Sequence, residues 1–148
     1  MAIKFFVPGL PATQDSKRHV GGGHIIDSCK RLPEWRAAVG YHAAQARTGA
    51  LIEDAVMLHL YFRMPRPKSH MGKKGLRLTA PLEHIKKPDL SKMVRAVEDA
   101  LKGVIWLDDS QVVLLTAQKR YCKGNEKPGV IVVINELWEK TKGADNET

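Results

Sequence analysis

Three aspartates stand beside one helix-like segment of a strongly basic chain, and their side chains could bind a divalent metal ion. Asp89 precedes the segment and the pair Asp108-Asp109 follows it, within the stretch KPDLSKMVRAVEDALKGVIWLDDSQ at residues 87–111. Carboxylates brought together repel one another and raise one another's pKa, so such a group needs compensation. Hard divalent cations take oxygen ligands. Because the formal net charge is +8, we expect a polyanion as the partner of that metal.

The same stretch carries a spaced pattern that resembles a known family. The pattern is roughly K-P-D-x-D-x-x-x-[KR]-A-x-x-D-A-L-x-G-x-x-x-x-D-D-x-Q-[VI], and the chain matches it at Lys87, Pro88, Asp89, Arg95, Ala96, Asp99, Ala100, Leu101, Gly103, Asp108, Asp109, Gln111 and Val112. In these positions the chain resembles the RusA family of Holliday-junction resolvases, small phage and prophage endonucleases. One position departs, because the second aspartate of D-x-D is replaced by Ser91. Weaker similarities in VPGLP, PEWR and FRMPRPKSH extend the resemblance over most of the chain.

The resemblance implies a Mg²⁺-dependent or Mn²⁺-dependent endodeoxyribonuclease that resolves four-way DNA junctions by paired nicks. Asp89 and Asp109 are the implied metal ligands, and Asp108 either binds the metal as well or orients its neighbour. Magnesium keeps several waters, so three acidic side chains are ample for one ion. Such an ion supplies a nucleophilic water, neutralises the phosphoryl charge and assists the leaving oxygen. Arg95 occupies the family's basic position, where a permanently charged guanidinium would act as an electrostatic clamp.

Each aspartate also has a structural interpretation. Asp89 can cap the N-terminus of a helix, and Asp108-Asp109-Ser110 can form a turn before a strand. Both interpretations lose weight because the pieces occur together at the family's spacing. Asp99 lies ten residues after Asp89, about 80° away around the same helix. It is either near the site or a structural acceptor, and we leave it outside the core site.

Ser91 leaves the strength of the metal site open, because a hydroxyl is a neutral and much weaker ligand than a carboxylate. The ion binds through Asp89, Asp109 and water alone, or Asp108 fills the gap, or metal affinity is poor. In the last case the protein is a catalytically weak or inactive DNA-structure-binding protein, which is our alternative function. Ser91 equally suits the first turn of a helix. An RNA-binding or ribonucleolytic domain is less favoured, since no aromatic RNP-type motif is visible.

Basic residues flank the aspartates and are expected to contact DNA phosphates. We expect contacts from Arg66, Lys68, Lys73, Lys74, Arg77, Lys87 and Lys92. A second basic group contains Lys119, Arg120, Lys123 and Lys127. One such cluster is equally consistent with a solvated loop, but two clusters around a carboxylate motif favour phosphate contacts. The loop histidines His70 and His84 stay unassigned.

The apolar pattern predicts the elements that must position these residues. We expect strands over 3–7, 24–26, 54–64, 112–120 and 130–137, and helices over 33–47 and 90–102. The last two strands, joined by KGNEKPG, form a hairpin candidate. Residues 65–87 combine prolines, glycines and cations without an apolar period, which indicates a long mobile basic loop, and residues 140–148 indicate a frayed tail. The best fit is an α+β domain with a mixed or mainly antiparallel sheet and helices on one face.

Length and composition fit a single domain over residues 1–148, with a hydrophobic fraction of 43%. No apolar run approaches the ~20 residues of a membrane span, and the N-terminus lacks a signal-peptide pattern. Cys29 and Cys122 form no metal-type cluster. We therefore expect a cytoplasmic protein with reduced thiols and no membrane partner. The family resemblance implies a homodimer, because its two-fold symmetry would match that of a branched DNA partner recognised through phosphate geometry.

Overall fold

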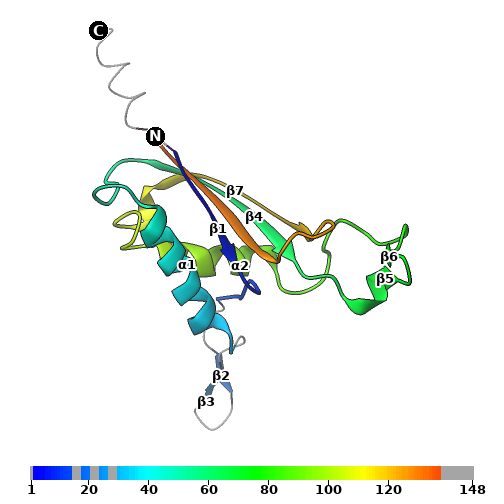
Figure 1. The fold of residues 1–148 in the computed structure, drawn as a ribbon. Coiled ribbons are helices and arrows are strands. Elements are labelled where there is room, and N and C mark those ends of the chain that lie inside the picture. The colour runs from blue at the N-terminus through cyan, green and yellow to red at the C-terminus, as the bar shows by residue number, and fades with distance from the viewer. Residues whose placement is uncertain (1, 15–17, 21–23, 27–29, 138–148) are drawn as a thin grey trace.

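A four-stranded mixed sheet forms the centre of the protein (Figure 1). The structure is a computed structural model that describes residues 2–14, 18–20, 24–26 and 30–137. The strands of the central sheet are β1 (Ala2–Pro8), β4 (Val56–Met64), β7 (Val112–Tyr121) and β8 (Gly129–Glu136), in the order β1-β8-β4-β7. β8 is antiparallel to both β1 and β4, whereas β4 and β7 are parallel. With two helices against this sheet, the predicted α+β class is confirmed.

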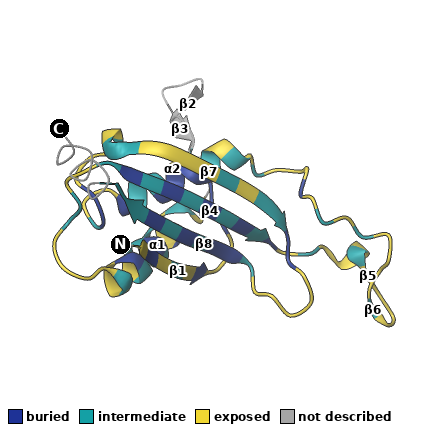
Figure 2. Cartoon of the chain, turned by 90° about the horizontal axis from the view of Figure 1, so that it is seen from above, coloured by how far each residue is buried: buried dark blue, intermediate teal, exposed yellow. Residues whose placement is uncertain are grey.

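β4 shows why only one face of the sheet carries the core. Side chains along a strand point alternately to opposite faces. The buried set of β4 consists of Val56, Leu58, Leu60, Phe62 and Met64, and the partly exposed set of Met57, His59, Tyr61 and Arg63. Figure 2 shows this alternation on the open face of the sheet, with both helices behind it. The helices therefore cover one face and leave the other to solvent.

The two helices pack against each other as well as against the sheet. α1 (Leu32–Ala46) has Pro33 in its first turn, where the missing N–H costs no hydrogen bond, and it buries Trp35, Val39 and Ala43. α2 (Leu90–Leu101) is amphipathic and buries Met93, Val94, Ala96, Val97 and Leu101. Because α2 links the parallel strands β4 and β7, it runs back along the sheet. Its N-terminus consequently lies near the end of β7, and its C-terminus near the start of β7.

The predicted hairpin between the last two strands is wrong. β8 inserts between β1 and β4, and β7 lies on the other side of β4. The sequence GVIVVINE of β8 is a nearly continuous apolar run, which suits a strand with a neighbour on each side. The other predicted strands and both helices are confirmed to within two residues at each end.

Residues 65–87 project from the body as an arm, at the right of Figure 1. The arm was expected to be a loop, but it contains a short 3-10 helix, η1 (Lys68–His70), and a ribbon of β5 (Met71–Gly72) and β6 (Gly75–Leu76). A second ribbon pairs β2 (Arg18–Val20) with β3 (His24–Ile26). Cys122 is a free, buried thiol, whereas Cys29 and the predicted frayed tail lie outside the described residues. Among those residues, no helix is long and apolar enough to cross a membrane.

Candidate metal and DNA site

Asp89 occupies the N-cap position of α2, but its carboxylate is not used for capping. Its side chain accepts no hydrogen bond from the first turn, so the alternative of a capping side chain is wrong, although Asp89 does occupy the N-cap position. Its Oδ2 instead lies 3.6 Å from Nζ of Lys92, one turn along the helix. Both side chains are exposed. Asp89 therefore presents its carboxylate to solvent beside a cation.

Lys119 fixes the backbone immediately before Asp89. Its Nζ donates hydrogen bonds to the carbonyl oxygens of Lys86, at 2.7 Å, and Pro88, at 2.8 Å. Burial lowers the pKa of Lys119, and the carboxylate of Asp89 acts in the opposite direction. Sequence analysis placed Lys119 in a general basic group and missed this role. The contact joins residues more than 30 positions apart, so no local pattern could have indicated it.

Asp108 caps the short 3-10 helix η2 (Asp109–Gln111) that precedes β7. Its Oδ1 accepts a hydrogen bond from the Ser110 backbone at 3.1 Å, which lowers the pKa of this carboxyl. The Gln111 side chain accepts from the Asp108 backbone at 2.8 Å and donates to the Ile52 carbonyl at 2.8 Å. The residues Asp108 and Gln111 therefore form a capping box, which gives the aspartate pair a structural component.

Asp109 is held by a core residue. The indole Nε1 of Trp106, which is fully buried, donates to Oδ1 of Asp109 at 2.9 Å. Glu98 lies nearby on α2, and burial followed by the negative charges of Asp109 and Asp99 raises its pKa. Sequence analysis did not select Glu98, because a glutamate on an amphipathic helix carries no distinguishing signal. Asp109 thus belongs to a small acidic region at the C-terminal half of α2.

One chain does not bring Asp89 and Asp109 together. Asp89 starts α2, whereas Asp109 lies near Glu98, and the helix rises ~13 Å between positions 89 and 98. Both carboxylates would have to lie about 2.1 Å from a shared Mg²⁺ ion. No group of three or more His, Cys, Asp or Glu side chains in the described part of the chain could hold a metal. The donor chemistry suits a hard cation, but the two ligands stand at opposite ends of α2.

Tyr121 anchors the arm at the end of β7. The rings of His70 and His84 each lie 4.8 Å from its ring in edge-on geometry, and the guanidinium of Arg66 lies 4.9 Å from the ring centre. The backbone N–H of Tyr121 donates to the Leu82 carbonyl at 2.8 Å. Burial and then the charge of Lys119 lower the pKa of His84. Both unassigned histidines therefore have a structural role at the root of the arm.

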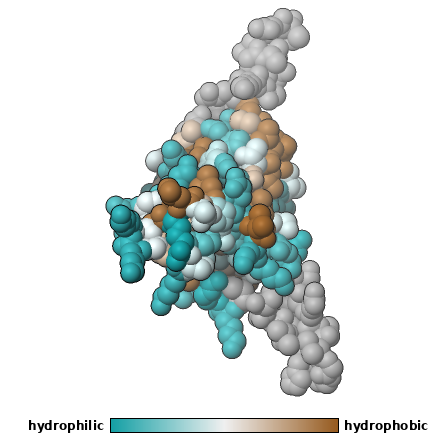
Figure 3. Space-filling model, turned by 90° about the vertical axis from the view of Figure 1, so that its right-hand side faces the viewer, coloured by the Kyte–Doolittle hydropathy of each residue, from teal (hydrophilic) through white to brown (hydrophobic). Residues whose placement is uncertain are grey.

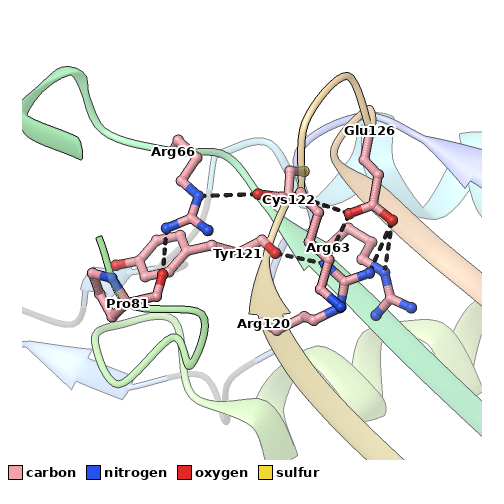
Figure 4. Close-up of polar contacts among 8 residues, drawn as sticks. Arg63, Arg66, Pro81, Arg120, Tyr121, Cys122 and Glu126 are labelled. Atoms are coloured by element: carbon pink, nitrogen blue, oxygen red, sulfur yellow. Dashed lines mark hydrogen bonds and ion pairs between the residues drawn. The ribbon is translucent and has the colours of Figure 1, made fainter. Parts of the chain in front are cut away.

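Arg66 joins the outgoing and returning sides of the arm (Figure 4). Its Nε donates to the Cys122 carbonyl at 3.0 Å, and its Nη1 donates to the Pro81 carbonyl. These bonds occupy much of a guanidinium that we expected to contact DNA. The remaining predicted contacts of the arm are exposed: Lys68, Lys73, Lys74, Arg77 and Lys87. Arg95 on α2 is also exposed, which keeps it accessible to a phosphate.

The second basic group is partly neutralised. Arg120 forms a bidentate pair with Glu126, with N–O distances of 2.8 and 2.9 Å (Figure 4). Hydrogen bonding from Arg120 lowers the pKa of Glu126 to about 2. Lys123 and Lys127 stay exposed beside this pair. The exposed positive charge is therefore concentrated on the arm rather than on the loop after β7.

Comparison with known proteins decides the family. The family model described as endodeoxyribonuclease RusA matches residues 8–135. The chain belongs to the RusA family. It is also 35% identical over 141 residues to "Uncharacterized protein YqaN" of Bacillus subtilis (strain 168). The aligned region covers 91% of this chain and 96% of that protein. The RusA match includes both ends of α2 and the whole arm, so the resemblance first visible at residues 87–112 is confirmed.

Proposed function

We propose that this RusA-family protein is an endodeoxyribonuclease that resolves four-way DNA junctions with Mg²⁺ or Mn²⁺ as its cofactor. Family membership supports endodeoxyribonuclease activity on branched DNA. The observation that carries the proposal further is the exposed carboxylate of Asp89, which occupies a cap position without capping and lies beside Nζ of Lys92. A carboxylate exposed in this way is available for a cation, and a cation there would meet phosphates attracted by the basic arm.

The residues at the two ends of α2 have separate tasks in this proposal. Asp89 and Asp109 hold the divalent ion, which when bound activates water and neutralises charge on the phosphoryl group. Trp106 orients the carboxylate of Asp109, and Lys119 holds the backbone that carries Asp89. Arg95 is exposed on α2, where its charge can stabilise the negative charge that develops during phosphodiester cleavage.

A second copy of the chain supplies the missing half of the site in this proposal. β7 is an edge strand of the sheet, and Val113, Leu114 and Leu115 are exposed along its first half. The arm covers the second half, through a bridge between Glu83 and Arg120. Exposed apolar strand edges favour pairing with another chain. The open half of β7 is therefore the surface that we assign to a homodimer.

Antiparallel pairing of two β7 strands about a two-fold axis near Leu114 would complete two equivalent sites. Such pairing sets the start of one strand against the end of the other. Asp109 precedes β7, and Lys119, which holds the loop before Asp89, lies near its end. Asp109 of one copy would thus approach Asp89 of the other. Two sites related by this symmetry match paired nicks in symmetric strands.

A cleavage assay on a labelled four-way junction tests the proposal. The wild-type chain should nick two opposed strands in Mg²⁺ or Mn²⁺, leave a duplex of the same sequence intact, and lose activity in EDTA. Asp109→Asn should bind the junction without cutting it, and Asp54→Asn, an exposed aspartate outside the motif, should cut normally. Junction binding without cleavage in either metal would favour the alternative of an inactive DNA-structure-binding protein, and stronger binding to folded RNA would contradict both.

Mixing two inactive variants tests the shared site. If each site takes Asp89 from one copy and Asp109 from the other, a dimer of Asp89→Asn with Asp109→Asn has one intact site. The mixture should therefore recover single-strand nicking. No recovery, with dimers demonstrated by sedimentation, would mean that each chain holds its own metal.

A further inference from the structure

The end of the arm exposes apolar side chains. Leu78 is fully exposed, at 105% of its reference area, and Met71 and Leu76 are exposed by 46% and 44%. Met71 pairs with Leu76 across the β5–β6 ribbon, so these two side chains lie on the same face of the ribbon. Single exposed apolar residues are common, but three within eight residues of a projecting end need an explanation. We call residues 71–78 the tip of the arm.

Cations surround these apolar side chains. Lys73 and Lys74 form the turn of the ribbon and Arg77 follows it, and all three are exposed. Gly75 closes the turn with a φ of +103°, a conformation that L-residues rarely adopt. Figure 3 views the molecule from the side that bears the arm and shows isolated apolar side chains among hydrophilic ones. This combination fits a partner that offers both phosphates and an apolar surface.

The tip is held in place from its root. The contacts of Tyr121 with His70 and of Arg66 with the Pro81 carbonyl fix both sides of the arm where it leaves the sheet. Within the arm, the backbone N–H of Arg77 donates to the His70 carbonyl at 2.9 Å. The arm can therefore direct its apolar side chains at a fixed distance from the body, which reduces the ordering needed on binding.

We propose that the tip inserts Leu78, supported by Met71 and Leu76, between bases at the branch point of DNA, while Lys73, Lys74 and Arg77 hold the neighbouring phosphates. This inference rests on the proposed function and adds a structure-reading element to it. Proteins that kink DNA place apolar side chains between base steps, at the cost of unstacking them. Unstacking costs least where pairing or stacking is already interrupted. A junction would thus be preferred over a duplex without any base-specific contact.

Fluorescence of 2-aminopurine at the branch point tests the insertion, because this base brightens when it is unstacked. The experiment uses the full chain carrying Asp109→Asn, which prevents cleavage. Binding should brighten the probe, and the triple change Met71→Ser, Leu76→Ser and Leu78→Ser should abolish the rise. Because burial of an exposed leucine side chain changes an equilibrium by roughly tenfold or more, preference for the junction over duplex should fall by about tenfold. Tyr41→Ser, which alters an exposed aromatic residue on α1, should leave the rise unchanged.

Each other outcome has a defined meaning. A full fluorescence rise in the triple variant would overturn the insertion, and so would a changed oligomeric state of that variant in sedimentation, since the tip would then be a protein contact. Junction cleavage by the wild type without any rise would overturn the insertion alone. A rise without cleavage would retain the insertion and overturn the nuclease, and absence of junction binding would overturn both.

Discussion

The indole nitrogen of Trp106 lies 2.9 Å from Oδ1 of Asp109, so a fully buried residue orients a half-exposed carboxylate. Trp106 forms an isolated β-bridge with Lys102, the residue directly after α2, and Asp109 is the first residue of η2. Because Trp106 is fixed in the core, this hydrogen bond fixes the orientation of the Asp109 carboxylate relative to the core. The second oxygen of Asp109 has no hydrogen bond from any described residue, and it is the one we expect to face a cation.

Trp106→Phe should lower junction cleavage by at least about tenfold, since loss of one charge-assisted hydrogen bond is worth roughly 1.5–3 kcal/mol. The matched control is Trp35→Phe. Trp35 is also buried, but its Nε1 has no hydrogen-bond partner within the described chain, so this change removes no contact to a carboxylate. Cleavage rates and thermal unfolding of both variants would check the prediction. If Trp106→Phe and Trp35→Phe lost the same amount of activity at the same stability, the positioning role of Trp106 would be contradicted.

Ser91→Asp should raise metal affinity or at least preserve cleavage, because it restores the family carboxylate beside Asp89. Calorimetric titration with Mg²⁺ and Mn²⁺ measures the affinity directly. Ser69→Asp adds the same charge to an exposed position of the arm and should leave metal binding unchanged. A folded but inactive Ser91→Asp protein would show that the site is organised around the hydroxyl.

Replacing Lys73 and Lys74 with alanine should reduce the salt dependence of junction binding. Each phosphate neutralised on duplex arms contributes a slope of about −0.9 in a plot of log K against log[salt]. The double variant should therefore give a slope shallower by up to about 1.8, equally for junctions of different sequence, because phosphates carry no base information. Lys30→Ala, at an exposed residue before α1, is the control. An unchanged slope in the double variant would remove the arm from the interface.

Lys119→Met should impair cleavage more than binding. The change keeps the length of the side chain but removes two hydrogen bonds to the carbonyls of Lys86 and Pro88. We expect a stability loss of about 1–3 kcal/mol and a cleavage rate that falls about tenfold or more as the backbone before Asp89 loosens. Lys123→Met, at an exposed position after β7, controls for charge. Wild-type cleavage by Lys119→Met would contradict the positioning role.

The pair of Arg120 and Glu126 predicts a specific acid sensitivity. The pKa of Glu126 is lowered from 4.5 to about 2 in the folded chain. The pair therefore stabilises the folded state fully above the pKa of Glu126 in the unfolded chain, near 4.5, and this contribution is lost as the pH falls toward 2. Because the Glu126 side chain is 38% exposed, we expect no more than about 1 kcal/mol.

Urea unfolding of wild type and Glu126→Gln checks this sign. The two proteins should differ at pH 6, and the difference should shrink between pH 4.5 and pH 2. Glu53→Gln, at an exposed glutamate before β4, should track the wild type throughout. A difference that grows in acid would contradict the prediction.

Local periodicity was sufficient for most elements but not for their order in the sheet. The alternation of apolar residues in β4 and the apolar stripe of α2 are local patterns that can be seen in about ten consecutive residues. Both elements were therefore predictable. The position of β8 between β1 and β4 depends on pairing with β1 over more than 100 residues and with β4 over more than 60 residues, whereas proximity in sequence favoured a hairpin with β7. Without that order, the exposed edge of β7 could not be identified.

The candidate site was predictable in composition but not in arrangement. The family spacing selected Asp89 and Asp109. It did not show that Asp89 lies at the N-terminus of α2 whereas Asp109 lies near the C-terminal half of that helix. The roles of Lys119 and Arg66 depend on contacts with distant backbone carbonyls, which leave no local pattern. The capping box of Asp108 and Gln111 was visible in the spacing, but Asp108 was interpreted as a metal ligand, as the residue that orients its neighbour, or as part of a turn.

The central place of β8 has a consequence for the order of events during synthesis. β1 and β4 are both made long before β8, yet neither pairs with the other, because β8 separates them. Until residue 136 has been added, β1 lacks its sheet partner and β4 has one unpaired edge. Nascent chains thus expose strand edges that favour misassembly with other chains. We expect fragments ending before residue 129 to require chaperones or to aggregate, although they contain every residue of the candidate site.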